Sequence, residues 1–420
     1  MKKRYIVLFL LVVLSAITFL DRLSIAVSGP LIQDQLHISP ERWGWVLGAF
    51  VLSCGIFEIP SGALGDRRGQ RRELTRIVAW WSAFMAGTAA CFSFWQLVIV
   101  RFLFGAGEAG AYPNASGVVS RWFPTTERAR AQSFIWAASR LGGVLTPLLV
   151  VPLQARIGWR FVFVFFGLLG AAWAVVWWLW FRDAPREQPG IREEELDEIA
   201  KGAHTGTRDA IPWRRLLASP QLWLISIAYF CYAWGTYFYF TWFPSWMVRS
   251  ASFSERQMGF FAALPFLCGM AGNIAGGFLS DGLVKHYGVK FGRRVVLSST
   301  LIVSAAMLLG MSLVSGKVTI VVLACLGFGV ADLMLPSAWS LCLDIGGEFA
   351  GTVSGVMNTA GQFGGVFCTV SFGYIIKMTG SYNKPLWLVA SMVVVAAILF
   401  ARVDASKPLL DESEFTIPVS

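Results

Sequence analysis

Ionisable side chains that could bind or move charged species stand inside long apolar stretches of this sequence. A charge at the centre of a membrane helix costs roughly 2.5–3.5 kcal/mol, so each such residue requires a partner or a function. Three patterns stand out. Asp21 and Arg22 are an adjacent acid and base, Arg101 and Glu108 stand seven residues apart, and Arg140 is a further arginine. The apolar stretches contain Asp21, Arg22, Glu58, Arg101, Glu108, Arg140 and Asp332.

The spacing of Arg101 and Glu108 places a cation and an acid on one face of a helix, about two turns apart. An arginine guanidinium binds a carboxylate through two parallel hydrogen bonds, and a carboxylic acid removed from water can exchange a proton near neutral pH. The histidines all stand in predicted loops, at His37, His204 and His286. A proton carrier among the apolar stretches is therefore a carboxylate, and the pattern suits coupled binding of an anion and a proton.

The elements that carry these side chains are predicted to be membrane helices. The chain has 420 residues, of which 56% are hydrophobic and 14% charged, against roughly 25% charged in soluble proteins. This composition excludes a soluble enzyme and a disordered chain. A membrane helix needs about 20 apolar residues, and we predict twelve such runs, at approximately 5–30, 43–65, 75–94, 96–120, 131–153, 160–181, 221–248, 257–280, 295–314, 317–344, 350–376 and 385–403.

Basic residues are unevenly distributed over the predicted loops. With the N-terminus in the cytoplasm, 24 of the 35 Lys and Arg residues fall on the inner side and 8 on the outer side, which leaves Arg22, Arg101 and Arg140 within helices. This bias predicts a multi-pass protein of the cell inner membrane with both termini cytoplasmic. The net charge of +10 thus follows from membrane topology, and we expect no nucleic-acid partner.

An internal repeat divides the chain. Gly62–Asp66 recurs as Gly277–Asp281, 215 residues later, and Pro113 and the pair Gly142-Gly143 recur at offsets of 223 and 222 residues. We therefore predict an all-α fold of two pseudo-symmetric six-helix bundles, with the substrate site at their interface near the midplane. The expected parts are an N-terminal bundle at 1–181, a cytoplasmic loop at 182–218, a C-terminal bundle at 219–403 and a cytoplasmic tail at 404–420.

The segment from Gly62 to Arg72 resembles the loop motif between helices 2 and 3 of the major facilitator superfamily, G-x-L-x-D-R-x-G-x-R-R. The resemblance covers essentially the whole chain. A narrower resemblance is to the anion:cation symporter family, which includes bacterial sugar-acid carriers. It rests on Asp21-Arg22, Arg101, Gly107-Glu108-Ala109-Gly110, Pro113, Trp122-Phe123-Pro124 and Glu127-Arg128-Ala129-Arg130.

The resemblance implies roles for the buried charges. It assigns Arg22 and Arg101 to the anionic substrate, and Asp21 and Glu108 to proton coupling. The alternative for Arg101 is a permanent salt bridge that packs one helix on another, and the two acids could be static partners. Arg140 stands where related vesicular carriers are uncharged. It is either a second anion-binding arginine, which would favour a dianion, or a partner of Glu58 or Glu108.

The second half offers polar aromatic and amide side chains in place of charges. Tyr232 and Tyr239 are seven residues apart on one predicted helix, and Asn358 and Gln362 are four apart on another. Such groups hydrogen-bond hydroxyls, and rings stack on sugar faces, which suits a polyhydroxylated acid. We take all four as candidate substrate-binding residues. The alternative for the tyrosines is helix packing or an interfacial belt.

The loop motif has a separate predicted role. The resemblance implies that Asp66, with Arg67 and Arg71, forms a conformational gate, and that Asp281 followed by Arg293-Arg294 is its counterpart in the second half. The alternative is that these positive charges only set the topology.

The sequence therefore predicts a proton-coupled symporter that imports an organic anion by alternating access, with a sugar acid (a hexuronate, aldonate or aldarate) as substrate. An organic-anion antiporter, or a carrier of aromatic or other carboxylates without proton coupling, remains the alternative. We expect no enzyme activity and no cofactor, because no nucleotide loop or catalytic triad is present. The seven cysteines form no C-x-x-C pair, so no metal site is expected. The resemblance implies a monomer whose partners are its substrate, protons and the lipid bilayer.

Overall fold

The computed structural model describes residues 2–200, 213–346, 350–407 and 409. Within these ranges every regular element is a helix, and each of the twelve predicted apolar runs is helical. The first half contains α1 (Lys3–Val27), α2 (Gly29–Leu36), α3 (Pro40–Arg68), α4 (Gln70–Thr88), α5 (Phe94–Glu108), α6 (Ala111–Trp122) and α7 (Thr125–Trp180). The second half contains α10 (Pro220–Tyr237), α11 (Phe243–Arg249), α12 (Glu255–Phe261), α13 (Ala263–Tyr287), α14 (Val289–Leu313), α15 (Lys317–Gly346), α16 (Ala350–Thr379) and α17 (Lys384–Arg402).

Two short helices lie between the halves: α8 (Glu193–Ala200) and α9 (Trp213–Ala218). Among the described residues, six helices are long and apolar enough to cross a membrane by themselves. Others miss that standard for local reasons. The fourth predicted run misses it because the run is divided into α5 and α6, which have 15 and 12 residues. One of the six counted helices lies in α7, which joins two predicted runs across Gly158, whose φ of 78° turns the chain.

Prolines explain the two irregular places that matter for the site. Pro113 cannot donate a hydrogen bond to the carbonyl of Ala109, four residues earlier, and the helix is interrupted at 109–110. In the second half, Pro244 cannot donate to the carbonyl of Phe240, and a π-helical turn at Phe238–Trp242 separates α10 from α11. Because a π turn takes more residues than an α turn, side chains after Tyr237 leave the face that regular spacing predicts.

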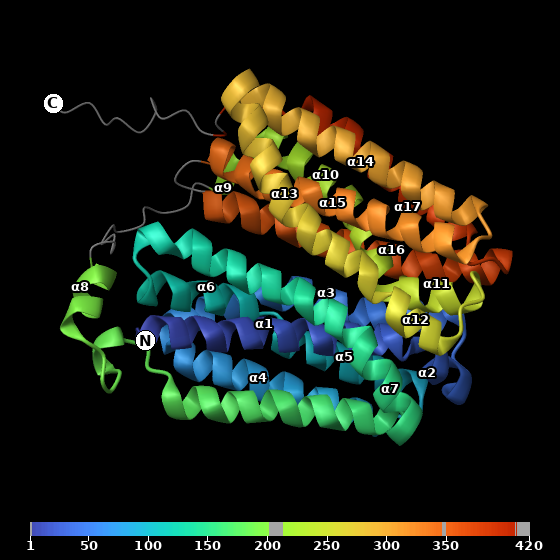
Figure 1. Ribbon diagram of the computed structural model, residues 1–420, viewed down its shortest axis with the longest axis horizontal. Coiled ribbons are helices and arrows are strands. Elements are labelled where there is room, and N and C mark those ends of the chain that lie inside the picture. The colour runs from blue at the N-terminus through green and yellow to red at the C-terminus, as the bar shows by residue number, and fades with distance from the viewer. Residues whose placement is uncertain (1, 201–212, 347–349, 408, 410–420) are drawn as a thin grey trace. The chain divides into compact units, whose positions relative to one another are not determined.

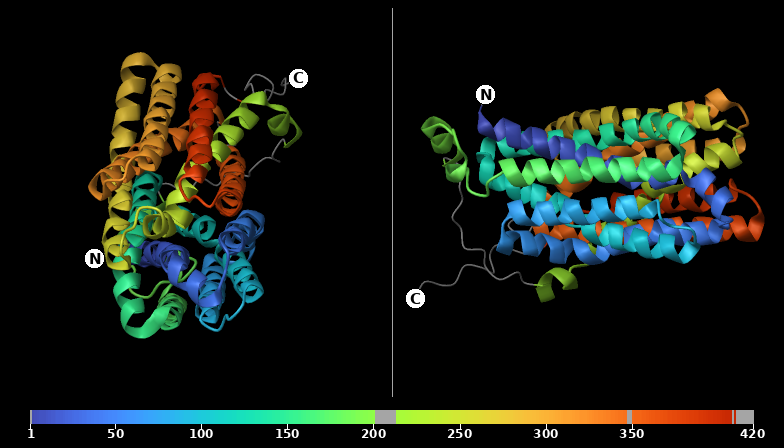
Figure 2. Two further views of the ribbon diagram at one scale, coloured as in Figure 1. Left: turned by 90° about the vertical axis from the view of Figure 1, so that its right-hand side faces the viewer. Right: turned by 90° about the horizontal axis from the view of Figure 1, so that it is seen from below.

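The chain forms two compact units that are interleaved in sequence. Unit 1 comprises Met1–Thr207, Phe240–Ala263 and Phe372–Met378, and unit 2 comprises Arg208–Tyr239, Leu264–Ser371 and Thr379–Ser420. In unit 1, α1 and α4 pack along α7, and α3 packs along α5 (Figure 1). In unit 2, α14 packs against α15 and α17, and α10 packs against α17 (Figure 2). The predicted boundaries near 181 and 219 stay predictions.

Close helix contacts in unit 1 depend on small residues. A Cβ added at Gly142 of α7 would lie 2.5 Å from the carbonyl oxygen of Ala16 in α1. Such close approach is the usual way in which membrane helices associate. It brings α1, which carries Asp21 and Arg22, against α7, which carries Arg140.

Candidate functional site

Four charged side chains from α1 and α5 form what we call the interior cluster: Asp21, Arg22, Arg101 and Glu108. Arg22 donates from Nε and Nη2 to the same oxygen, Glu108 Oε1, at 3.0 and 2.6 Å. The Glu108 side chain has no exposed surface, and that of Arg22 is 15% exposed. The two residues that the sequence assigned to different roles, substrate and proton, are thus in direct contact.

The other two members of the interior cluster lack hydrogen bonds of normal geometry, although the Trp81 indole lies near Asp21. Both oxygens of Asp21 and all three guanidinium nitrogens of Arg101 are buried without a hydrogen-bond partner among the described residues, as is Glu108 Oε2. Asp21 lies within electrostatic range of Arg101 and Glu108. Leaving a charged group buried and unpaired is strongly unfavourable. Such groups in a helix interior are typical of a site that acts on a ligand or a proton.

Aromatic rings surround the two arginines. The Arg22 guanidinium carbon lies 5.2 Å from the ring centre of Phe19 and 5.1 Å from that of Phe50. The Arg101 guanidinium carbon lies 5.0 Å from the same Phe50 ring and 4.3 Å from that of Phe104. Ring faces attract cations, most strongly where water is excluded.

Tyr112 is a residue that the sequence reasoning missed. Its hydroxyl lies 3.0 Å from Ser15 Oγ, and its ring stacks on Trp136 with centres 4.8 Å apart. It is within electrostatic range of Arg22, Glu108 and Arg140. A signal was present, because Tyr112 follows Glu108 by four residues, a spacing that shares a helix face.

Arg140 belongs to the same unit. It is 7% exposed on α7, and its guanidinium carbon lies 5.8 Å from the ring centre of Phe240. Glu108, one of its two expected partners, is engaged by Arg22 through Oε1. Whether Arg140 binds a second anionic group or pairs with Glu58 or Glu108 stays a prediction.

The candidates of the second half lie in unit 2. The Tyr237 hydroxyl donates to Gln362 Oε1, which adds a tyrosine that regular helical spacing did not select. Tyr232 packs on Tyr229 with ring centres 5.2 Å apart, and Asn358 is half-buried.

Tyr239 has a different setting. It lies in the π-helical turn, its hydroxyl is 3.7 Å from the sulfur of Met311, and its ring is 4.8 Å from that of Phe328. It is therefore in the packed interior of α14 and α15. Its role as a substrate-binding residue stays a prediction.

The predicted gate residues are distributed over both units. The side chains of Asp66 and Arg67 lie outside the described residues. Arg71 donates to the carbonyl oxygen of Trp178 at 3.0 and 2.6 Å, and its backbone amide donates to Asp183. These contacts tie the start of α4 to the end of α7.

The predicted counterpart of the gate is an ion-pair group in unit 2. Arg293 lies 3.5 Å from Asp281 and 3.0 Å from Asp344, and it donates to Ser280 Oγ at 2.6 Å. Asp344 is a partner that the sequence did not indicate, because it is 51 residues away on α15.

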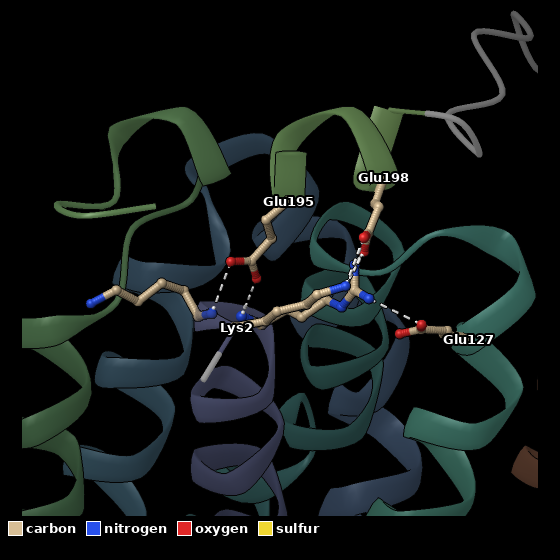
Figure 3. A network of polar contacts seen from close by, with 6 residues as sticks. Lys2, Glu127, Glu195 and Glu198 are labelled. Carbon is tan, nitrogen blue, oxygen red and sulfur yellow. Dashed lines mark hydrogen bonds and ion pairs between the residues drawn. The ribbon is translucent and has the colours of Figure 1, made fainter. Parts of the chain in front are cut away.

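A second group of charges, the rim network, holds the first turn of α1 to α8 (Figure 3). Glu195 accepts hydrogen bonds from the backbone amides of Lys3 and Arg4 at 3.0 and 2.9 Å. Negative charge there also complements the helix dipole. The network consists of Lys2, Lys3, Arg4, Glu127, Glu195 and Glu198.

The remaining contacts of the rim network are ion pairs. Arg4 lies 3.0 Å from Glu127 of α7 and 2.8 Å from Glu198, which also pairs with Lys2 (Figure 3). The hydrogen bond from Lys2 lowers the pKa of Glu198. The network therefore joins α1, α7 and α8 at one end of unit 1.

Contacts at the opposite end of α1 and α3 also fall within unit 1. Arg249 forms an ion pair with Asp34 of α2, and Lys377 lies 3.1 Å from Glu41 of α3. Trp45 donates to the Tyr374 hydroxyl at 3.2 Å. Segments of the second sequence half thus close onto first-half helices at this end.

Among the described residues no group of His, Cys, Asp and Glu is arranged to hold a metal ion. The interior cluster consists of two arginines and two carboxylates.

The sequence profile of the Major Facilitator Superfamily matches residues 11–369, and the chain belongs to this family of membrane transporters. Among solved structures, a bacterial homologue of the human lysosomal transporter Spinster, in an inward-facing and unoccupied conformation, has a TM-score of 0.78 at 19% identity. The alignment covers 96% of this chain and 97% of that one. The fold is that of the family, with twelve membrane helices in two bundles.

Related proteins of named function indicate what kind of molecule such a transporter carries. The chain is 33% identical over 401 residues to a probable sulfoacetate transporter of Cupriavidus necator, covering 94% of this chain and 93% of that protein. It is 30% identical over 426 residues to the hexuronate transporter of Bacillus subtilis, covering 98% of both. A probable galactarate/D-glucarate transporter of Bacillus subtilis is also 30% identical, over 94% of this chain and 91% of that protein. The chain is therefore a multi-pass membrane transporter of organic anions.

Proposed function

We propose that the protein is a proton-coupled symporter that imports a small organic anion across the bacterial inner membrane. Both termini would be cytoplasmic, as the distribution of basic residues favours. The observation that carries the proposal is the contact of Arg22 with buried Glu108. The same arginine cannot hold a substrate carboxylate fully while it neutralises that glutamate, so protonation of Glu108 would release it.

The charge balance of the interior cluster supports this exchange. With Asp21 and Glu108 both ionised, their charges cancel those of Arg22 and Arg101. Each proton taken up leaves one positive charge uncompensated, and a substrate carboxylate restores the balance in a medium where net charge is costly. Proton uptake and anion binding would thus favour one another.

The direction of transport follows from the same balance. Each net positive charge that moves inward gains about 2.3 kcal/mol per 100 mV of membrane potential. Uptake is driven when more protons than substrate charges enter together. The contacts of Arg249 with Asp34 and of Lys377 with Glu41 would then close the outer end while substrate leaves toward the cytoplasm.

We further propose a sugar acid as substrate. The hexuronate and galactarate/D-glucarate transporters among the relatives support this class, as do the hydroxyl and amide groups of Tyr237, Gln362 and Asn358 in unit 2.

A second candidate is a small doubly charged acid such as sulfoacetate. The identity of 33% to the probable sulfoacetate transporter favours it. So does Arg140, which with Arg22 and Arg101 is a third arginine within the predicted membrane helices and suits a second anionic group.

Uptake into proteoliposomes tests the coupling. We expect accumulation of labelled D-glucuronate, D-glucarate or sulfoacetate to rise when the outside is made acidic, without any anion trapped inside. Uptake that ignores the pH gradient and requires an internal counter-anion would instead identify an antiporter.

A further inference from the structure

We propose that Phe50 is a positioning residue that holds Arg22 and Arg101 in register through the face of one shared ring. This inference rests on the proposed function, because the two arginines are the groups assigned to the anion. Phe50 does not touch the transported species in this account. It acts by fixing the two cations that do.

The geometry separates Phe50 from the other rings of the cluster. Phe19 precedes Arg22 by three residues on α1, and Phe104 follows Arg101 by three on α5, so these contacts are local to one helix. Phe50 belongs to α3 and contacts both arginines. Its ring centre lies 5.1 Å from the guanidinium carbon of Arg22 and 5.0 Å from that of Arg101. Its ring therefore contacts an arginine of α1 and an arginine of α5 at the same time.

The local backbone is built to admit this ring. Phe50 is 5% exposed. A Cβ added at Gly105 of α5 would lie 3.0 Å from Phe50 Cδ2 and 2.5 Å from its carbonyl oxygen. Any larger residue at 105 would push α3 away from α5 and take the ring off the arginines.

A physical need for the ring exists at Arg101. This guanidinium has no exposed surface and no hydrogen-bond partner among the described residues. A ring face stabilises a desolvated cation without neutralising it, so the arginine keeps its charge for an incoming anion. A carboxylate in the same place would stabilise the cation but would cancel that charge.

The shared ring also matters when Glu108 is protonated. Arg22 then loses its ion pair with Glu108, while its contacts with the rings of Phe19 and Phe50 do not depend on that proton. The ring thus keeps the released arginine in place for the substrate, which reduces the entropy lost when the anion binds.

Graded fluorination of the ring tests this inference with little change of shape. Phe50 is replaced by mono-, di- and trifluorophenylalanine, and the purified full-length protein is titrated with D-glucuronate, D-glucarate and sulfoacetate. Fluorine withdraws the negative charge of the ring face, so we expect both the affinity and the ligand-free melting temperature to fall stepwise. The trifluoro variant should lose about tenfold in affinity.

Phe57 provides the matched control, since it stands seven residues further along α3, is 38% exposed and packs on Phe102. The same fluorination there should change neither quantity. Phe50→Leu, which keeps an apolar side chain but removes the ring, should lose affinity. Equal affinity across the Phe50 series, or the same slope at Phe57, would overturn the inference.

The proposed function is judged separately by the pH-gradient dependence of wild-type uptake. If the pH gradient does not change uptake but the affinity of the Phe50 variants still falls with fluorination, proton coupling is wrong and the positioning role stands. If none of the three anions binds the wild-type protein, the proposed function and the positioning role both fail.

Discussion

The interior cluster and the rim network use the same residue types in opposite ways. At the rim, Glu195 accepts hydrogen bonds from the backbone amides of Lys3 and Arg4. Glu198 forms ion pairs with Lys2 and Arg4, and Arg4 also pairs with Glu127. In the interior, Arg101 and Asp21 have no hydrogen-bond partner among the described residues, although burial there makes a partner far more valuable.

This difference separates charges with a structural role from charges with a role in transport. The rim network also contains buried side chains, since Arg4 is 2% and Glu195 is 3% exposed, but each of them is held by a partner on a neighbouring helix. Asp21 and Arg101 attract one another only through space, without a hydrogen bond between them, and buried charges of this kind are typical of sites that act on a ligand or a proton. We therefore propose that the rim network holds α8 on α1 and that the interior cluster takes part in transport.

The largest expected effect follows from removing an interior cation. Arg22→Ala should weaken binding of the transported anion by at least about a hundredfold, because a desolvated charge-assisted contact is lost. The protein should still fold and reach the membrane. Isothermal titration with the anion measures this, and Lys2→Ala at the rim is the control that should bind like wild type.

If Arg22→Ala and Lys2→Ala bound the anion equally well, the distinction between interior and rim would fail.

A smaller effect, on selectivity, is expected at Arg140. Arg140→Gln should lower the affinity for doubly charged D-glucarate or sulfoacetate about tenfold more than that for singly charged D-glucuronate, because one cation for the second anionic group is removed. Competition uptake with the three anions measures the ratio. An equal loss for all three would make Arg140 a structural residue.

The smallest effect is expected at the rim. Glu198→Gln removes the ion pairs with Lys2 and Arg4, yet uptake should stay within about twofold of wild type, since exposed ion pairs are weak. Because the folded pKa of Glu198 is lowered, its stabilisation is present above the unfolded pKa and is lost as the pH falls through the folded value. The difference in melting temperature between wild type and variant should therefore shrink on acidification.

A difference in melting temperature that grew on acidification would contradict the assignment at Glu198, and a complete loss of uptake would show that the rim network takes part in transport.

Much of this arrangement is readable from the sequence, because helical spacing and apolar runs are local. The twelve runs were helical as predicted, and Arg101 and Glu108 do share α5. The contact between Arg22 and Glu108 joins residues 86 apart, and no local pattern reports how two helices pack.

The misses have physical causes as well. The π-helical turn at Phe238–Trp242 was not predicted from the sequence, and neither was the Tyr237–Gln362 hydrogen bond, which joins residues 125 apart. The substrate role of Tyr239 stays a prediction. The acidic run at 193–195 read as a polar loop, whereas it begins the helix α8, whose Glu195 docks on the first turn of α1. Eight residues make a marginal helix alone, so tertiary contact decides its formation.

One measurement tests directly whether Glu108 couples proton movement to transport of the anion. Glu108→Gln and wild-type protein are reconstituted in proteoliposomes, and uptake of the labelled anion is measured with and without an acidic exterior, beside counterflow exchange at equal pH. We predict that the variant keeps counterflow but gains nothing from the gradient, while wild-type uptake rises. A variant whose uptake still responds to the gradient as wild type does would contradict the account.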